Sequence, residues 1–256
     1  MTHPDIQLEL RGAVALVRLN RPAKRNALSD GLVIGLRQLF ETLPDGVRAA
    51  VLDGEGEHFC AGLDLSELKE RDAGQGLHHS RMWHAALEQV QYGKVPVVAA
   101  LHGAVVGGGL ELASACHVRV ADESTFYALP EGSRGIFVGG GGSVRIPRLI
   151  GAARMADMMF TGRVYNAQDG ERAGFAQYLV PAGEAFAKAL ALAERIAENA
   201  PLTNYALMHA LPRIAEQPAD QGFFTEALMA AIAQSAPEAK QRVQAFLDGR
   251  ASKVRK

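Results

Sequence analysis

The sequence predicts an α/β fold followed by a helical C-terminal region, and three observations support this. Residues 49–52 and 95–101 are short, almost wholly apolar segments, which is typical of strands covered on both faces by helices. Before the first of them, residues 32–43 carry apolar side chains at helical spacing. From residue 182 onward the chain is rich in alanine and has strong helical propensity.

The N-terminal elements follow from local patterns. Residues 6–10 alternate between apolar and polar side chains and are followed by Arg11-Gly12 and the apolar run 13–19, so we expect a β-hairpin. Ser29 or Asp30 can cap the helix that carries the apolar stripe. The chain therefore opens with a hairpin and an amphipathic helix.

The C-terminal part is predicted to be helical throughout. Residues 182–199 form one helix that Pro201 closes, and residues 203–214, 221–234 and 238–247 are further candidate helices. We accordingly expect an α/β core domain over residues 1–200 and a helical region over residues 201–256.

Composition excludes several classes of protein. The 27 Lys and Arg residues balance 28 Asp and Glu, so no basic field indicates nucleic-acid binding. Cys60 and Cys116 show neither metal-ligand nor disulfide spacing. The first ten residues lack the features of a signal peptide, and no apolar run is long enough to cross a membrane. We expect a cytoplasmic protein that binds neither nucleic acid nor membrane and holds no metal.

Two glycine-rich segments each bring a glutamate. Gly107, Gly108 and Gly109 follow the strand at 95–101, and free amides at the helix start expected there can stabilise a developing negative charge. Glu111 lies just inside this apolar helix, where a charge is costly to bury without a partner or a task. Glu131 precedes the second glycine-rich segment, residues 135–142. An oxyanion hole beside two carboxylates is one interpretation.

Other interpretations of these residues remain open. The glycines after the strand can simply permit a tight turn, and Glu131 can be a solvated turn residue. A dinucleotide site lacks the third glycine and the acidic residue at ribose-binding spacing. His78, His79 and His84 have no carboxylate or cysteine at metal-ligand spacing, and an exposed amphipathic helix explains them better. Trp83 is interpreted as a packing residue, with lining of a pocket as the alternative.

Five segments of the chain resemble successive signature blocks of the enoyl-CoA hydratase/isomerase (crotonase) superfamily. They occur in the family's order and spacing between about residues 6 and 180, with weaker similarity beyond. They read NRPAKRNAL, FCAGLDL, HGAVVGGGLELASAC, FYALPEGSRGIFVGGGGSVRIPRLIG and FTGRVYNAQDGERAGF. The resemblance implies a crotonase (ClpP-like) fold of repeated ββα units with a C-terminal helical trimerisation region, in homotrimers or homohexamers.

The resemblance also assigns functional positions. The thioester oxygen of an acyl-CoA would accept hydrogen bonds from the backbone amides of Leu63 and Gly108. The coenzyme A portion would lie along backbone near Lys24, Arg25, Ala61, Asp64 and Leu65. Gly139 matches a position whose backbone holds the reacting water. No cofactor is implied, because coenzyme A is part of the substrate.

The two glutamates, twenty positions apart as in the hydratases of the family, imply an enoyl-CoA hydratase of fatty-acid or aromatic-acid breakdown. Such an enzyme adds water syn across the double bond of a 2-enoyl-CoA, with Glu111 activating water and Glu131 protonating the α-carbon. The first alternative is an isomerase or hydratase-lyase of the same superfamily. The others are a serine peptidase using Ser114 with His117, and a non-catalytic CoA-binding protein.

One departure from the family pattern concerns the wall of the acyl pocket. The proline usual before Gly139 is replaced by Val138, which Phe137 precedes. This departure concerns the shape of the wall near the acyl group, and hence the chain length or aromatic character of the substrate.

Overall fold

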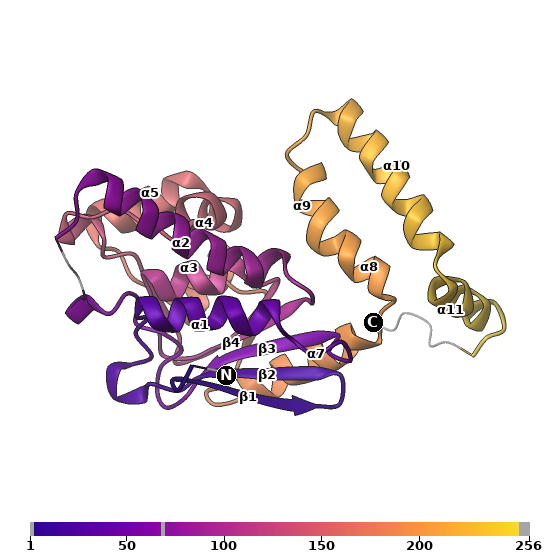
Figure 1. Cartoon of the computed structure of the whole chain (residues 1–256), viewed down its shortest axis with the longest axis horizontal. Helices are drawn as coiled ribbons and strands as arrows, with labels where there is room; N and C mark the ends of the chain where they lie inside the picture. The colour runs from indigo at the N-terminus through magenta and orange to yellow at the C-terminus, as the bar shows by residue number, and fades with distance from the viewer. Residues whose placement is uncertain (1–2, 68–69, 251–256) are drawn as a thin grey trace. The chain divides into compact units, whose positions relative to one another are not determined.

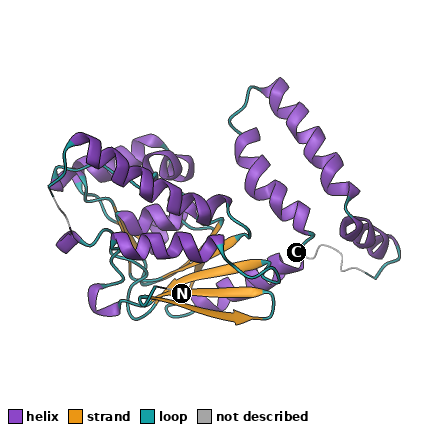
Figure 2. Cartoon of the chain, in the orientation of Figure 1, coloured by secondary structure: helices purple, strands orange, loops and turns teal. Residues whose placement is uncertain are grey.

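The computed structural model describes residues 3–67 and 70–250. The chain divides into two compact units, Met1–Ala197 and Glu198–Lys256. The first is a mixed α/β unit and the second is helical, as Figure 2 shows. The α/β class and the helical C-terminal region predicted from the sequence are both present.

A six-stranded sheet forms the centre of the first unit. Its strand order is β1-β2-β3-β4-β6-β9; only the edge pair β1 and β2 is antiparallel, and the other neighbours are parallel. The strands are β1 (Ile6–Arg11), β2 (Val14–Leu19), β3 (Ala49–Gly54), β4 (Val97–Leu101), β6 (Val118–Asp122) and β9 (Tyr178–Val180). A second sheet, ordered β5-β7-β8, contains β5 (Ala104–Val106), β7 (Phe126–Ala128) and β8 (Tyr165–Asn166).

Helices follow or connect these strands. In the first unit they are α1 (Asp30–Glu41), α2 (Ala73–Tyr92), α3 (Gly108–Ala115), α4 (Gly142–Ile150), α5 (Ala152–Thr161), α6 (Ala167–Ala173) and α7 (Ala185–Glu198). Three short 3₁₀ turns are η1 (Pro22–Lys24), η2 (Leu65–Glu67) and η3 (Gly132–Arg134).

The large sheet is covered on both faces because successive side chains of a strand point in opposite directions. Val17 and Leu52 lie in the core shared with α1, α2 and α3. Their neighbours Leu16 and Val51 pack on the opposite face against the alanine-rich side of α7. Figure 1 shows α1, α2 and α3 on one side of the strands and α7 on the other. This two-sided burial explains why β3 and β4 consist of apolar runs rather than alternating residues.

The predicted N-terminal elements are confirmed. Arg11 pairs with Val14 across a two-residue turn whose first residue, Gly12, has a φ of +57°. Ser29 is the helix cap, since its side chain accepts a hydrogen bond of 3.1 Å from the Leu32 amide. The strand predicted at 95–101 begins two residues later, at Val97.

The second unit contains α8 (Pro201–Tyr205), η4 (Ala206–Ala210), α9 (Leu211–Ile214), α10 (Ala219–Ser235) and α11 (Pro237–Leu247). The single helix predicted over residues 203–214 is interrupted by η4, which is a π-helical turn. Pro212 follows this turn and has no amide with which to continue an α-helical hydrogen-bond pattern. Among the described residues, no helix is long and apolar enough to cross a membrane.

Candidate active site

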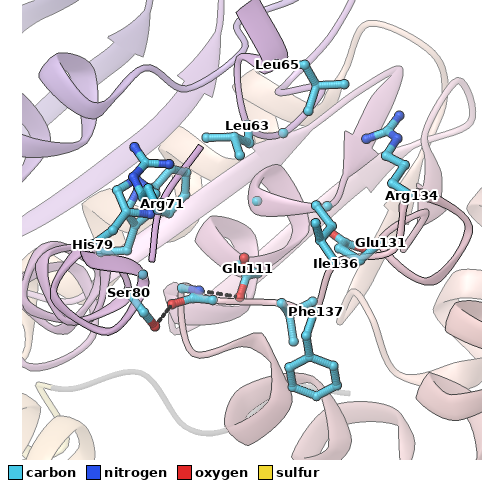
Figure 3. A pocket seen from close by; sticks show the side chains of 18 of the residues that line it. Leu63, Leu65, Arg71, His79, Ser80, Glu111, Glu131, Arg134, Ile136 and Phe137 are labelled. Carbon is cyan, nitrogen blue, oxygen red and sulfur yellow. Dashed lines mark hydrogen bonds between the residues drawn. The ribbon is translucent and has the colours of Figure 1, made fainter. Parts of the chain in front are cut away.

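A cavity of about 400 Å³ opens in the first unit where α2, the segment 61–65, the start of α3 and the segment 131–140 meet. Figure 3 shows the side chains around it. Seven positions predicted from the sequence line this cavity, and they come from both glycine-rich segments and from the segment after β3. They are Ala61, Leu63, Leu65, Gly108, Glu111, Glu131 and Gly139.

Glu111 is buried in the first turn of α3, and its carboxylate is held by the glycine segment. Its Oε1 accepts hydrogen bonds of 2.8 Å from the amides of both Gly140 and Gly142. Burial raises the pKa of Glu111 from its ordinary value of 4.5 to about 7, although the two amides and the charge of Arg145 act in the opposite direction. This glutamate can therefore take up or release a proton near neutral pH.

Glu131 precedes η3 and points into the same cavity. It is 7% exposed, and its Oε2 is a buried atom without a hydrogen-bond partner among the described residues. Burial raises the pKa of Glu131, and the charge of Glu131 also contributes to the raised pKa of Glu111. The structure thus brings two carboxyl groups to one cavity, and the charge of Glu131 makes ionisation of Glu111 less favourable.

Two backbone amides lie close together at the edge of the cavity. A Cβ atom built on Gly108 would lie 3.4 Å from the Leu63 nitrogen, so the segments that carry the two amides are neighbours. Within the described part of the chain, neither the Leu63 amide nor the Gly108 amide donates a hydrogen bond. Both are available to an oxygen atom of a ligand.

The approach of these segments depends on Gly62. Its φ is +96°, and a Cβ there would lie 2.7 Å from the carbonyl oxygen of Val106. Hydrogen bonds from Val106 to the Cys60 carbonyl (3.1 Å) and from Leu28 to the Gly62 carbonyl (2.7 Å) fix the segment on both sides. A larger residue at position 62 would separate the two amides.

Lys24, Arg25 and Asp64 do not line the cavity, and contacts join Lys24 and Arg25 to the segment 61–65. The Ala61 amide donates to the Arg25 carbonyl (2.9 Å), which joins the turn after β2 to the cavity segment. Asp64 forms ion pairs with Arg21 (2.7 Å) and Lys24 (3.2 Å). Its pKa is held well below the ordinary range, mainly by the hydroxyl of Ser66 and with support from both cations. The carboxylate of Asp64 is thus engaged within the protein.

Gly139 and its neighbours form the wall where the sequence departs from the family pattern. The Gly139 carbonyl accepts a 2.6 Å hydrogen bond from Ser80. Val138 is buried and lines the cavity. Phe137 is 69% exposed, and in Figure 3 its ring points away from Glu111.

Helix α2 contributes four residues to the cavity, and of these the sequence interpretation considered only Trp83 for the lining of a pocket, as the alternative to packing. Gly76, His79, Ser80 and Trp83 recur at helical spacing on one face and all line the cavity. The prediction of an exposed helix was wrong for His79, which is partly buried and forms a 2.7 Å contact with Asp30. The helical spacing of the four α2 residues could have indicated that they lie on one face of that helix.

The peptidase alternative is not supported by the geometry. The Ser114 hydroxyl donates to the Glu111 carbonyl (2.7 Å). His117 accepts a hydrogen bond from the Val97 amide (3.0 Å) through Nδ1, and its Nε2 lies 2.9 Å from the Gln91 carbonyl oxygen. Both side chains are engaged by backbone groups rather than by each other. Among the described residues, no group of three or more His, Cys, Asp or Glu side chains could hold a metal ion.

Comparisons with known proteins agree with one another. The enoyl-CoA hydratase/isomerase family model matches residues 9–255. A solved structure of a proposed enoyl-CoA hydratase from Rhodopseudomonas palustris CGA009 superposes with a TM-score of 0.95 at 58% identity over 99% of each chain. The Mycobacterium tuberculosis enoyl-CoA hydratase EchA19 is 30% identical, covering 97% of this chain and 95% of that protein. The 2,3-dehydroadipyl-CoA hydratase of Escherichia coli is 32% identical over 93% of both.

Proposed function

The chain belongs to the enoyl-CoA hydratase/isomerase family and has the crotonase fold, and on this basis we propose that it adds water to the double bond of a 2-enoyl-CoA thioester. The observation that carries the proposal is the presence of two buried glutamates in the same cavity as two unengaged backbone amides. Hydration of a conjugated thioester needs both an acid/base pair and stabilisation of an enolate oxygen.

In the proposed reaction, the thioester oxygen accepts hydrogen bonds from the Leu63 and Gly108 amides. Negative charge develops on this oxygen when water attacks the β-carbon, and fixed donors there lower the barrier; loss of one such donor costs about 10²–10³-fold in rate in other enzymes. Glu111 removes a proton from the attacking water as its oxygen bonds to the β-carbon. Glu131 delivers a proton to the α-carbon on the same face, which completes syn addition.

Hydrogen bonding favours this division of roles. The Gly140 and Gly142 amides stabilise the ionised form of Glu111 that a base requires. The buried Oε2 of Glu131 has no donor among the described residues, which favours its protonated form. After each turnover a proton must pass from Glu111 to Glu131, directly or through water, to restore the starting state.

The coenzyme A portion of the substrate is proposed to lie along the backbone at Lys24 and Arg25 and at Ala61, Asp64 and Leu65. No separate cofactor is required for this chemistry. We also propose that the chain assembles into homotrimers or homohexamers and acts in the cytoplasm. Size-exclusion chromatography with light scattering tests the assembly.

A turnover screen tests the proposed function. Purified protein is mixed with crotonyl-CoA, longer 2-enoyl-CoAs and cinnamoyl-type CoA esters, and loss of the conjugated-thioester absorbance is followed. We expect bleaching with at least one ester and losses of about 10²–10⁴-fold in both Glu111→Gln and Glu131→Gln. Binding of CoA esters without turnover of any of them would instead indicate a non-catalytic CoA-binding protein.

A further inference from the structure

The segment Gly139 to Gly142 determines where the carboxylate of Glu111 lies. Gly140 and Gly142 hold the same oxygen, Oε1, through their amides. A Cβ on Gly142 would lie 2.7 Å from Cγ of Glu111, and one on Gly140 would lie 3.2 Å from Cδ. The backbone and the carboxylate are therefore in close contact, and a shift of this segment would move Glu111.

One side of the segment is fixed by α2. The Ser80 hydroxyl donates a 2.6 Å hydrogen bond to the Gly139 carbonyl. Three residues further along the helix, the ring of Trp83 would lie 3.1 Å from a Cβ on Gly140. Figure 3 shows Ser80 to the left of Glu111, with a dashed line for its hydrogen bond to the glycine segment.

The other side is fixed by Arg145 of α4. Its Nη1 donates to the Gly140 carbonyl (2.9 Å), and its Nε donates to Oε1 of Gln91 in α2 (2.6 Å). Arg145 is only 8% exposed, yet no carboxylate in the described part of the chain lies within ion-pair distance of it. A buried cation without a paired anion is costly, and here it faces the site that holds Glu111.

We propose that Ser80 and Arg145 are positioning residues for the hydration reaction. Together they fix the glycine segment from two helices, so that one oxygen of Glu111 stays bound to the Gly140 and Gly142 amides and the other faces the substrate. The inference rests on the proposed function, because it assigns Glu111 the role of base.

Several charged groups surround Glu111, and they differ in their effect on its pKa. The charge of Glu131 raises the pKa of Glu111, whereas the charge of Arg145 lowers it. Arg134 of η3 and His79 of α2 also line the cavity.

Other ionisable groups face Ser80 or Arg145. His84 of α2 contacts Ser80 at 3.3 Å. Burial lowers the pKa of Arg145, Glu88 and Tyr92 of α2 act to raise it, and Arg148 of α4 acts to lower it. Arg145 is the cation that acts directly on Glu111, so its removal is the informative perturbation.

The pH dependence of kcat/KM tests the effect of the charge. Its acidic limb reports the ionisation of a base in the free enzyme. Removing the charge in Arg145→Gln should move this limb to higher pH by about 0.5–1 unit. Arg145→Lys keeps the charge and should restore the limb to the wild-type position. Arg148→Gln removes the same charge from an exposed site on the same helix and should leave the limb in place.

An unmoved limb in Arg145→Gln, or an equal shift in Arg145→Lys, overturns the inference. Ser80→Ala provides a second test that does not remove a buried charge. It should lower kcat about tenfold while KM stays within about twofold, because it disturbs a group needed in the transition state. A raised KM with unchanged kcat would instead place Ser80 in substrate binding and contradict the positioning role.

A readout independent of turnover separates this inference from the proposed function. The carboxyl carbon of Glu111 can be titrated by NMR in ¹³C-glutamate-labelled protein, with Glu111→Gln identifying the signal. Arg145→Gln should raise its midpoint, and an unchanged midpoint refutes the charge effect. A wild-type protein that hydrates no enoyl-CoA would refute the proposed function while this titration still tests the role of Arg145.

Discussion

Substitution of Glu111 by glutamine should abolish most activity and yet stabilise the protein at alkaline pH. The amide side chain has the same shape, and its oxygen can still accept hydrogen bonds from Gly140 and Gly142. It cannot act as a base, so kcat/KM should fall about 10²–10⁴-fold. Glu111→Gln therefore keeps the position of the side chain and removes only its ability to take up a proton.

The stability effect follows from the ionisation of a buried acid. The pKa of Glu111 is about 7 in the folded chain, against an ordinary value of 4.5. This difference in pKa means that ionisation of Glu111 lowers the free energy of unfolding by at most ~3 kcal/mol above pH 7. Because the folded state binds the proton more tightly, wild-type stability falls as pH rises from 4.5 to 7, and Glu111→Gln removes this fall. The gain will be smaller where the new amide N–H groups lack acceptors.

Urea unfolding at pH 5 and pH 8 measures this effect. Trp83 is the single tryptophan of the chain and is buried against the glycine segment, so its fluorescence reports on the site. We expect the variant to be about as stable as wild type at pH 5 and up to ~3 kcal/mol more stable at pH 8. Equal stability at both pH values, or activity near that of wild type, would refute the reasoning about Glu111.

Three further variants test neighbouring features. Glu131→Gln should lose about 10²–10⁴-fold in kcat/KM with an equal or higher Tm, since a buried oxygen of Glu131 has no described partner; a large drop in Tm argues against this. Gly142→Ala should displace Glu111, because the added Cβ lies 2.8 Å from Oε1. Thermal melts should show a loss of stability of about 1–3 kcal/mol, and initial-rate assays should show kcat lowered at least tenfold. Asp64→Asn should raise KM for CoA thioesters and lower Tm at neutral pH by weakening the contact with Lys24 (3.2 Å). Because the pKa of Asp64 is lowered in the folded chain, the Asp64 carboxylate stabilises the protein above pH 3.8, its ordinary pKa, and this stabilisation is lost as the pH falls below 3.8. The difference in Tm between wild type and Asp64→Asn should therefore shrink in acid and should not grow.

The architecture of the first unit was largely predictable because its signals are local. The capping hydroxyl of Ser29 and the apolar runs of β3 and β4 each reflect the burial or hydrogen bonding of a single element. A helix at the glycine triplet was also predicted, and α3 begins at Gly108, directly after Gly107, whose φ of +53° glycine readily adopts. The π-helical turn before Pro212 was missed, since its position depends on one absent amide within a good helical pattern.

Glu111, Glu131 and the amides at the start of α3 were predicted because they accompany conspicuous glycine-rich segments, whereas the Leu63 amide was assigned from the family resemblance. Ser80, Arg145 and Gln91 were not found. Ser80 and Arg145 are 65 positions apart in the sequence, and their common contact with the glycine segment arises because α2 and α4 both pack against α3. Such long-range convergence leaves no periodic or compositional signal.

The mass of the acyl-CoA product formed in H₂¹⁸O shows whether this cavity adds water to an enoyl-CoA. Hydration gives a product heavier than the substrate by one labelled water, with the label in the hydroxyl group on the β-carbon. A product of unchanged mass would indicate isomerisation, and shortened acyl-CoA or free coenzyme A would indicate cleavage; any of these as the sole outcome would contradict the proposed hydration.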